Sequence, residues 1–168
     1  MINNDTLRRI RYTFDYNDTK MIGLFRLGGL HVTREQLNTW LKKDEDPDFV
    51  ECDDPSFSVF LNGLIIQNRG AREEHPPQPD KKLTNNMVLM KLKIALDLKS
   101  EDVLAILQLA EFRISKHELS AFFRKPGHKH YRECLDQFLR NFLTGMKLKY
   151  RDKKEVSKAF EWNDIIKK

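Results

Sequence analysis

The stretch ECDDPSFSVFLNG at residues 51–63 returns 82 residues later as ECLDQFLRNFLTG at residues 133–145. The same shift aligns the chain without a gap from Asn3 to Leu64, and 13 of these 62 positions are identical in the two copies. A repeat of this kind indicates a duplicated structural unit, because each copy keeps the positions that its own fold requires. The chain is therefore predicted to be one module written twice.

The repeat divides the 168 residues into a first repeat over 1–66, a linker over 67–84, a second repeat over 85–148 and a basic tail over 149–168. The linker holds three of the six prolines, and Gly70 is its predicted helix stop. A module of about 60 residues buries only about 60% of the surface that its unfolded chain exposes. We therefore expect the two repeats to dock on each other with approximate two-fold symmetry.

Apolar residues recur at helical spacing in both repeats, and no segment alternates long enough to predict a strand. The expected fold class is all-α, with four helices in each repeat. Asn4 and Asn86 are the predicted N-caps of the first helices. Thr33 and Ser115 each precede Gln or Glu by three residues, which predicts capping boxes at the third helices.

The two fourth helices are expected to differ at their starts. Asp54 followed by Pro55 predicts an N-cap with proline in the first helical turn. The second repeat has Asp136 and Gln137 instead, so its helix is predicted to run unbroken from about His130. The tail after Tyr150 carries scattered apolar residues that indicate a further amphipathic helix.

The net charge of +5 is concentrated in the tail. Residues 147–168 contain eight Lys or Arg and four Asp or Glu, which leaves the duplicated body with a net charge of +1. No apolar stretch approaches the ~20 residues that cross a bilayer, and the first residues lack the pattern of a secretory signal. A cytoplasmic protein without membrane association is the expectation.

Two sets of chemically reactive residues are candidate sites. Cys52 and Cys134 recur in Glu-Cys-x-Asp, and we interpret them as buried apolar fillers, because a reactive thiolate needs a nearby cation or helix N-terminus. His128, His130 and Cys134 form H-x-H-x3-C, a hypothetical metal or thiol site. A zinc site needs about four ligands, and no second pair completes this one.

Motifs of common enzymes are missing from the sequence. It has no glycine-rich phosphate loop, no HExxH, no nucleophile elbow and no dinucleotide fingerprint. The expectation is a protein without catalytic activity and without a cofactor or metal.

A helix-turn-helix outline is the most specific functional pattern. The second helix, a turn with Gly28 and Gly29, and the third helix have this arrangement in the first repeat. Against it, a body of nearly zero net charge supplies little attraction for phosphates. The outward faces of the third helices are predicted to contact a partner or nucleic acid through Arg34, Asn38, Lys42, Lys116, Ser120 and Arg124.

Several blocks of the chain resemble one known family. The start Asn3-Asn4-Asp5, the block FLNGLI at residues 60–65, and the blocks YREC and DQFLR at residues 131–134 and 136–140 are similar to the YehS family of small bacterial proteins. This resemblance covers about residues 1–148 and implies a bacterial origin and a tandem domain of unknown function. It implies no activity, substrate or catalytic residue.

The function predicted from the sequence is therefore the binding of another macromolecule, with a protein favoured over nucleic acid as the partner. The alternative is a helix-turn-helix-like nucleic-acid-binding protein that uses the third helix of each repeat.

Overall fold

The computed structural model describes residues 1–71 and 76–153, and these are helical with no strand. The first module contains four helices, α1 (Asn3–Phe14), α2 (Asp18–Leu27), α3 (Arg34–Leu41) and α4 (Asp54–Arg69). The second repeats them as α5 (Asn85–Ala95), α6 (Ser100–Leu109), α7 (Lys116–Ala121) and α8 (Asp136–Met146). A π-helical extension, η1 (Lys147–Asp152), continues α8. The predicted all-α fold of two four-helix modules is confirmed, and the rest of the predicted tail helix lies outside the described residues.

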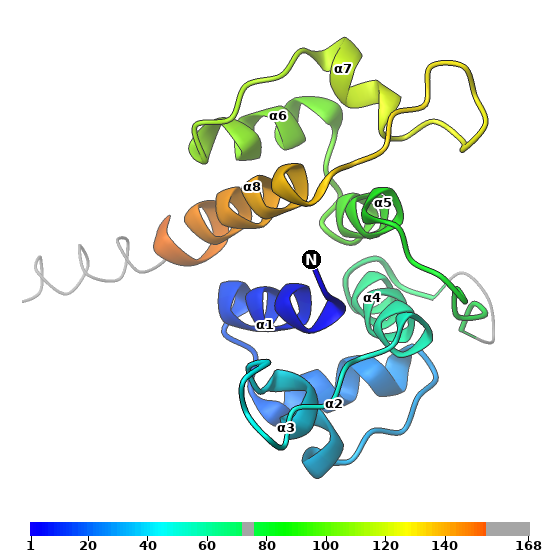
Figure 1. Cartoon of the computed structure of the whole chain (residues 1–168), viewed down its shortest axis with the longest axis vertical. Helices are drawn as coiled ribbons and strands as arrows, with labels where there is room; N and C mark the ends of the chain where they lie inside the picture. The colour runs from blue at the N-terminus through cyan, green and yellow to red at the C-terminus, as the bar shows by residue number, and fades with distance from the viewer. Residues whose placement is uncertain (72–75, 154–168) are drawn as a thin grey trace, which may run out of the picture.

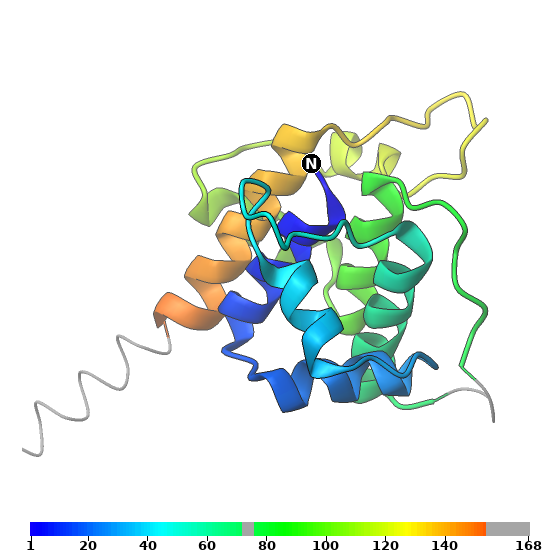
Figure 2. The ribbon, with the colours of Figure 1, turned by 60° about the horizontal axis from the view of Figure 1, so that its bottom comes forward.

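The helices α1, α4, α5 and α8 form the centre of the molecule (Figure 1). α4 packs on α5, and α1 packs on α8 and η1, so each module lays its first helix against the last helix of the other. α2 and α3 lie at one end of the long axis, and α6 and α7 at the other. Figure 2 shows from another side that α1 lies beside α8 and α4 beside α5. Because the first helix of each module packs on the last helix of the other, the two modules have the expected approximate two-fold relation.

Glycine allows the fourth helix of each module to approach the second. A Cβ added at Gly63 would lie 1.8 Å from the carbonyl oxygen of Leu24, and one added at Gly145 would lie 2.0 Å from that of Ile106. Both contacts are with backbone, which cannot move aside as a flexible side chain does. The repeated glycine therefore sets how closely the two helices pack.

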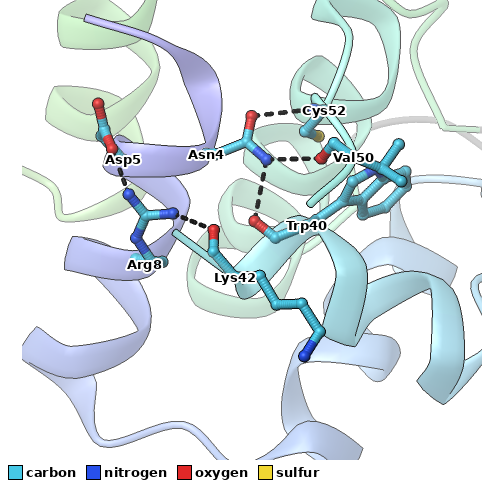
Figure 3. A network of polar contacts seen from close by, with 7 residues as sticks. All are labelled: Asn4, Asp5, Arg8, Trp40, Lys42, Val50 and Cys52. Carbon is cyan, nitrogen blue, oxygen red and sulfur yellow. Dashed lines mark hydrogen bonds and ion pairs between the residues drawn. The ribbon is translucent and has the colours of Figure 1, made fainter. Parts of the chain in front are cut away.

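A buried asparagine ties together the start of α1 and the loop that leads from α3 to α4 (Figure 3). The side-chain amide nitrogen of Asn4 donates to the carbonyl oxygens of Trp40 and Val50, each at 2.9 Å. Its Oδ1 accepts the backbone N–H of Cys52, also at 2.9 Å. We call this arrangement the asparagine clamp; it satisfies the carbonyl of Trp40 in the last turn of α3 and two backbone groups of the loop that follows.

The second module has the same clamp. Asn86 donates to the carbonyl oxygens of Phe122 and Arg132 at 3.0 and 2.8 Å, and accepts the N–H of Cys134 at 2.9 Å. The prediction that Asn4 and Asn86 are N-caps is therefore wrong. Both lie inside their helices with side chains directed away from the helix end, and Thr84 caps α5 instead.

The clamp also explains why the predicted continuous helix from about His130 is wrong. Arg132 donates its N–H to the carbonyl oxygen of Ala121 and gives its own carbonyl to Asn86, so its backbone bonds across the module. α8 consequently begins only at Asp136, and Cys134 precedes it in the loop. In the first module the N-cap is Asp53, one residue before the predicted Asp54. At the third helices Thr33 and Ser115 are N-caps as predicted, with the full capping box at Ser115.

The aspartates at the starts of α4 and α8 join the two modules. Asp54 accepts the side-chain amide of Asn3 at 2.7 Å and the backbone N–H of Leu83 at 2.8 Å. Asp136 accepts the corresponding amide of Asn85 at 2.8 Å and the amino group of Met1. Each fourth helix is therefore bonded to the start of its own module and to the start of the other.

We predict that Gly63→Ala and Gly145→Ala each lower the free energy of unfolding by about 2 kcal/mol or more, because the new methyl group clashes with backbone. Gly23→Ala is the matched control, since Gly23 is an exposed α2 residue with open space around its Cβ position. This control is expected to stabilise by roughly 0.5–1 kcal/mol through helix propensity. Urea denaturation measures all three variants, and equal effects would contradict the packing role of Gly63 and Gly145.

A second stability prediction concerns the asparagine clamp. Asn4→Ala and Asn86→Ala are each expected to cost about 2–4 kcal/mol, because buried backbone donors and acceptors lose their partners. Asn38→Ala removes an exposed amide from α3 and is expected to change stability by less than about 0.5 kcal/mol. A loss at Asn4 no larger than that at Asn38, measured by urea denaturation, would show that the clamp is not structural.

Candidate partner-binding groove

Two grooves lie where the modules meet, and the 82-residue shift relates their linings. The α1/α8 groove has a volume of about 690 Å³, and the α4/α5 groove about 430 Å³. Corresponding positions line both of them. These are Arg9 and Lys91, Tyr12 and Ile94, Thr144 and Asn62, and Lys147 and Ile65.

The described part of the linker that precedes α5 forms part of the wall of the α4/α5 groove through Pro77, Gln78 and Asp80. The carboxylate of Asp80 lies 3.1 Å from Nζ of Lys91 and accepts the hydroxyl of Ser58 at 2.8 Å. The backbone N–H of Asp80 donates to the same hydroxyl oxygen at 3.0 Å. The carboxylate of this extended segment is thus held between α4 and α5 by a cation and a hydroxyl.

The α1/α8 groove has arginines at the two positions that hold Asp80 in the other groove. Arg9 stands where Lys91 does, and Arg140 stands where Ser58 does. Both side chains are exposed, and neither has a hydrogen bond or ion pair with a residue in 1–71 or 76–153. The groove therefore offers two guanidinium groups that have no hydrogen bond or salt bridge to a carboxylate of the described chain.

The other charged groups of the α1/α8 groove already have partners. Arg8 bonds to Asp5 and donates to the carbonyl oxygen of Lys42 at 2.6 Å (Figure 3). Lys147 lies 3.8 Å from Asp152. Nearby, hydrogen bonds from the Met1 amino group and Asn85 lower the pKa of Asp136, and the charge of Arg140 adds to this effect.

One edge of the groove is aromatic. The ring of Tyr12 is about half exposed, and the guanidinium carbon of Arg151 lies 3.8 Å from its centre. Arg151 also lies 3.7 Å from Asp15, which matches the 2.8 Å pair of Arg69 and Asp97 in the other half. These contacts join η1 to α1 and hold one wall of the groove against the other.

The six residues predicted from the third helices lie outside these grooves, because α3 and α7 are at opposite ends of the long axis (Figure 1). Arg34 and Asn38 are exposed on α3, whereas Lys42 follows its end and lies 3.8 Å from Asp46. Lys116 pairs with Glu101 at 2.5 Å on the second module. Ser120 bonds to the carbonyl oxygen of His117, and Arg124 lies beyond the end of α7. The structure leaves these residues as two separate sets.

His128, His130 and Cys134 do not form a ligand cluster. The histidines are exposed, and the backbone N–H of His130 donates to the ring of His128 at 3.0 Å. Cys134 is only 2% exposed, and it lies in the loop that the clamp holds. Among the described residues, no group of three or more His, Cys, Asp or Glu is placed to hold a metal ion.

Both cysteines are buried, as predicted for apolar fillers. Burial, followed by the charges of Asp53 and Asp54, raises the pKa of the Cys52 thiol to about 12. Burial and then Asp136 raise the pKa of Cys134 to about 12. Both thiols therefore stay protonated near neutral pH.

Sequence reasoning did not identify Arg9 and Arg140 as residues of a site between the modules. Arg9 and Arg140 come from opposite ends of the chain, and their charges are unremarkable among 30 basic residues. The usable signal was the repeat, because Arg140 replaces Ser58 at an otherwise related position of the fourth helix.

Comparisons with known proteins agree with the repeat. A family model described as "Protein of unknown function (DUF1456)" matches residues 3–70 and again residues 85–152. The uncharacterized protein YehS of Escherichia coli (strain K12) is 44% identical over 155 residues, which cover 92% of this chain and 99% of the relative. No solved structure matches the chain. Within the described part of the chain, no helix is long and apolar enough to cross a membrane.

The raised thiol pKa values predict slow alkylation. In native protein at pH 8, only about one thiol in 10⁴ is ionised when its pKa is about 12. Iodoacetamide is therefore expected to modify neither cysteine within an hour, and to modify both after unfolding in urea. Mass spectrometry counts the adducts, and rapid labelling of the native protein would contradict the burial of these thiols.

Proposed function

Because this chain belongs to the DUF1456 family, whose description assigns no function, we propose from its architecture that it is a non-catalytic protein-interaction module. Its partner contributes an extended segment that binds in the α1/α8 groove. This segment lies between α1 and α8 in the way that the linker residues around Asp80 lie between α4 and α5.

The observation that carries this proposal is that a carboxylate of the chain itself occupies one groove, whereas the matching positions of the other groove hold none from the described residues. In one groove the chain supplies its own segment, and Asp80 satisfies Lys91 and Ser58. In the other, Arg9 and Arg140 occupy the matching positions without an ion pair among the described residues. Exposed arginines at the centre of a concave surface are typical of binding hot spots.

The groove is also built on rigid elements. α1 is fixed by the asparagine clamp at Asn4, and α8 by the bonds of Asp136 to Asn85 and Met1. A site whose walls are already ordered loses less entropy when it binds, so more of the contact energy remains as affinity.

A nucleic-acid-binding function is the second candidate, and the exposure of Arg34 and Asn38 on α3 favours it. The 25 acidic residues and the pairing of Lys116 with Glu101 weaken the attraction for phosphates. The two functions use different arginines, which makes them separable by experiment.

We predict that a photo-cross-linking amino acid at Thr144, in the α1/α8 groove, captures a protein from host lysate that the same probe at Asn38 does not. The captured protein is identified by mass spectrometry, purified and titrated against the full chain. Arg9→Ala/Arg140→Ala is expected to weaken this binding at least tenfold. The matched double variant Arg34→Ala/Arg124→Ala removes the same charge from α3 and from the loop after α7, and is expected to have less than a twofold effect.

Two results would overturn the proposal. One is that the variants rank in the opposite order, with binding lost from Arg34→Ala/Arg124→Ala. The other is cross-linking to nucleic acid from Asn38 and to no protein from Thr144, which would establish the helix-turn-helix alternative.

A further inference from the structure

We propose that the α1/α8 groove recognises an acidic peptide segment, with a side-chain carboxylate of the partner placed between Arg9 and Arg140. This inference rests on the proposed function and adds the chemistry of the ligand. The juxtaposition that carries it is the pair of exposed guanidinium groups at the positions that hold Asp80 in the other half of the molecule.

Asp80 acts as an internal stand-in for the ligand. Its carboxylate contacts α5 through Lys91 and α4 through Ser58, and thus bridges the two helices. Its backbone N–H also bonds to Ser58, so the peptide main chain is held together with the side chain. The approximate two-fold relation maps this position onto the space between Arg9 on α1 and Arg140 on α8.

The differences between the grooves specify a more acidic ligand. A cation and a hydroxyl in the α4/α5 groove become two arginines, and a guanidinium binds a carboxylate through two parallel hydrogen bonds. Ile65, which lines the α4/α5 groove, corresponds to Lys147. This lining position is thus apolar in the α4/α5 groove and basic in the α1/α8 groove.

The charges that line the α1/α8 groove determine how many acidic residues the peptide ligand needs. Asp5 is the carboxylate that lines the groove, and it is bonded to Arg8. Arg9 and Arg140 remain for the ligand, and Lys147 is within the same lining with a long 3.8 Å pair to Asp152. A segment with two or more neighbouring Asp or Glu residues complements these groups.

The test uses a fluorescently labelled hexaglutamate peptide and a hexaglutamine peptide of the same length, titrated against the full chain and followed by anisotropy. Hexaglutamate is expected to bind at least tenfold more tightly than hexaglutamine. Arg9→Ala/Arg140→Ala is expected to reduce hexaglutamate affinity at least tenfold, because both charge-assisted hydrogen-bonding groups are removed from the groove. Arg34→Ala/Arg124→Ala, with the same net charge, is expected to change it less than twofold.

A second variant tests whether binding depends on the two guanidinium groups or on positive charge in general. Arg9→Lys/Arg140→Ser copies the Lys91 and Ser58 pair of the α4/α5 groove and is expected to bind hexaglutamate with intermediate affinity. In amide NMR spectra, hexaglutamate is expected to shift Thr144 and Gly145 of α8 and to leave Asn62 and Gly63 of α4 unchanged. Circular dichroism confirms folding, which replacements of exposed side chains are expected to preserve.

Equal weakening by the two alanine double variants would show non-specific attraction of a polyanion and overturn the inference. So would shifts at Asn62 and Gly63, or hexaglutamine binding as tightly as hexaglutamate. Competition by double-stranded DNA that depends on Arg34 and Arg124 would favour the nucleic-acid reading. If Thr144 cross-links a protein that hexaglutamate does not displace, the ligand chemistry is wrong while the proposed function stands.

Discussion

The side-chain amides of Asn4 and Asn86 bond to the loops that connect the third helix of each module to the fourth. Each amide uses its two N–H groups and its oxygen to satisfy one carbonyl at the end of the third helix and two backbone groups of the loop that follows it. Leaving such groups without partners costs about 1–3 kcal/mol each, so these loops depend on the asparagines. The loops in turn set where α4 and α8 begin. The groove between α1 and α8 exists because both of its walls are positioned by this bond set.

Duplication then explains the rest of the architecture. Asp54 and Asp136 each accept hydrogen bonds from the starts of both modules, so neither module is complete alone. Arg69 with Asp97 and Arg151 with Asp15 repeat the exchange at the far ends of the same helices. Positions under this constraint have stayed alike in the two copies. Arg9 and Arg140 lie in the groove between α1 and α8, and there the copies differ in charge because Arg140 corresponds to Ser58.

The sequence predicted much of the fold and little of the candidate site. The capping residues Thr33 and Ser115 were predicted correctly, because an N-cap bond spans only three residues and depends on local order. Asn4 and Asn86 were predicted wrongly as caps, since their partners lie 36 to 48 residues away. The same distant partners prevent a helix from starting near His130. The third-helix contact residues remain predictions, which the structure places at two ends of the molecule.

The sequence by itself determined the helical fold class, the two modules and the buried state of the repeated cysteines. Helical periodicity, the capping residues and self-similarity are all local or internal to the chain, so they are readable without coordinates. Only the tertiary structure decided which helices meet, that a linker aspartate is held in one groove, and that Arg9 and Arg140 face the other. The physical reason is that these contacts join residues far apart in the chain, and helix packing, not sequence proximity, brings their charges together.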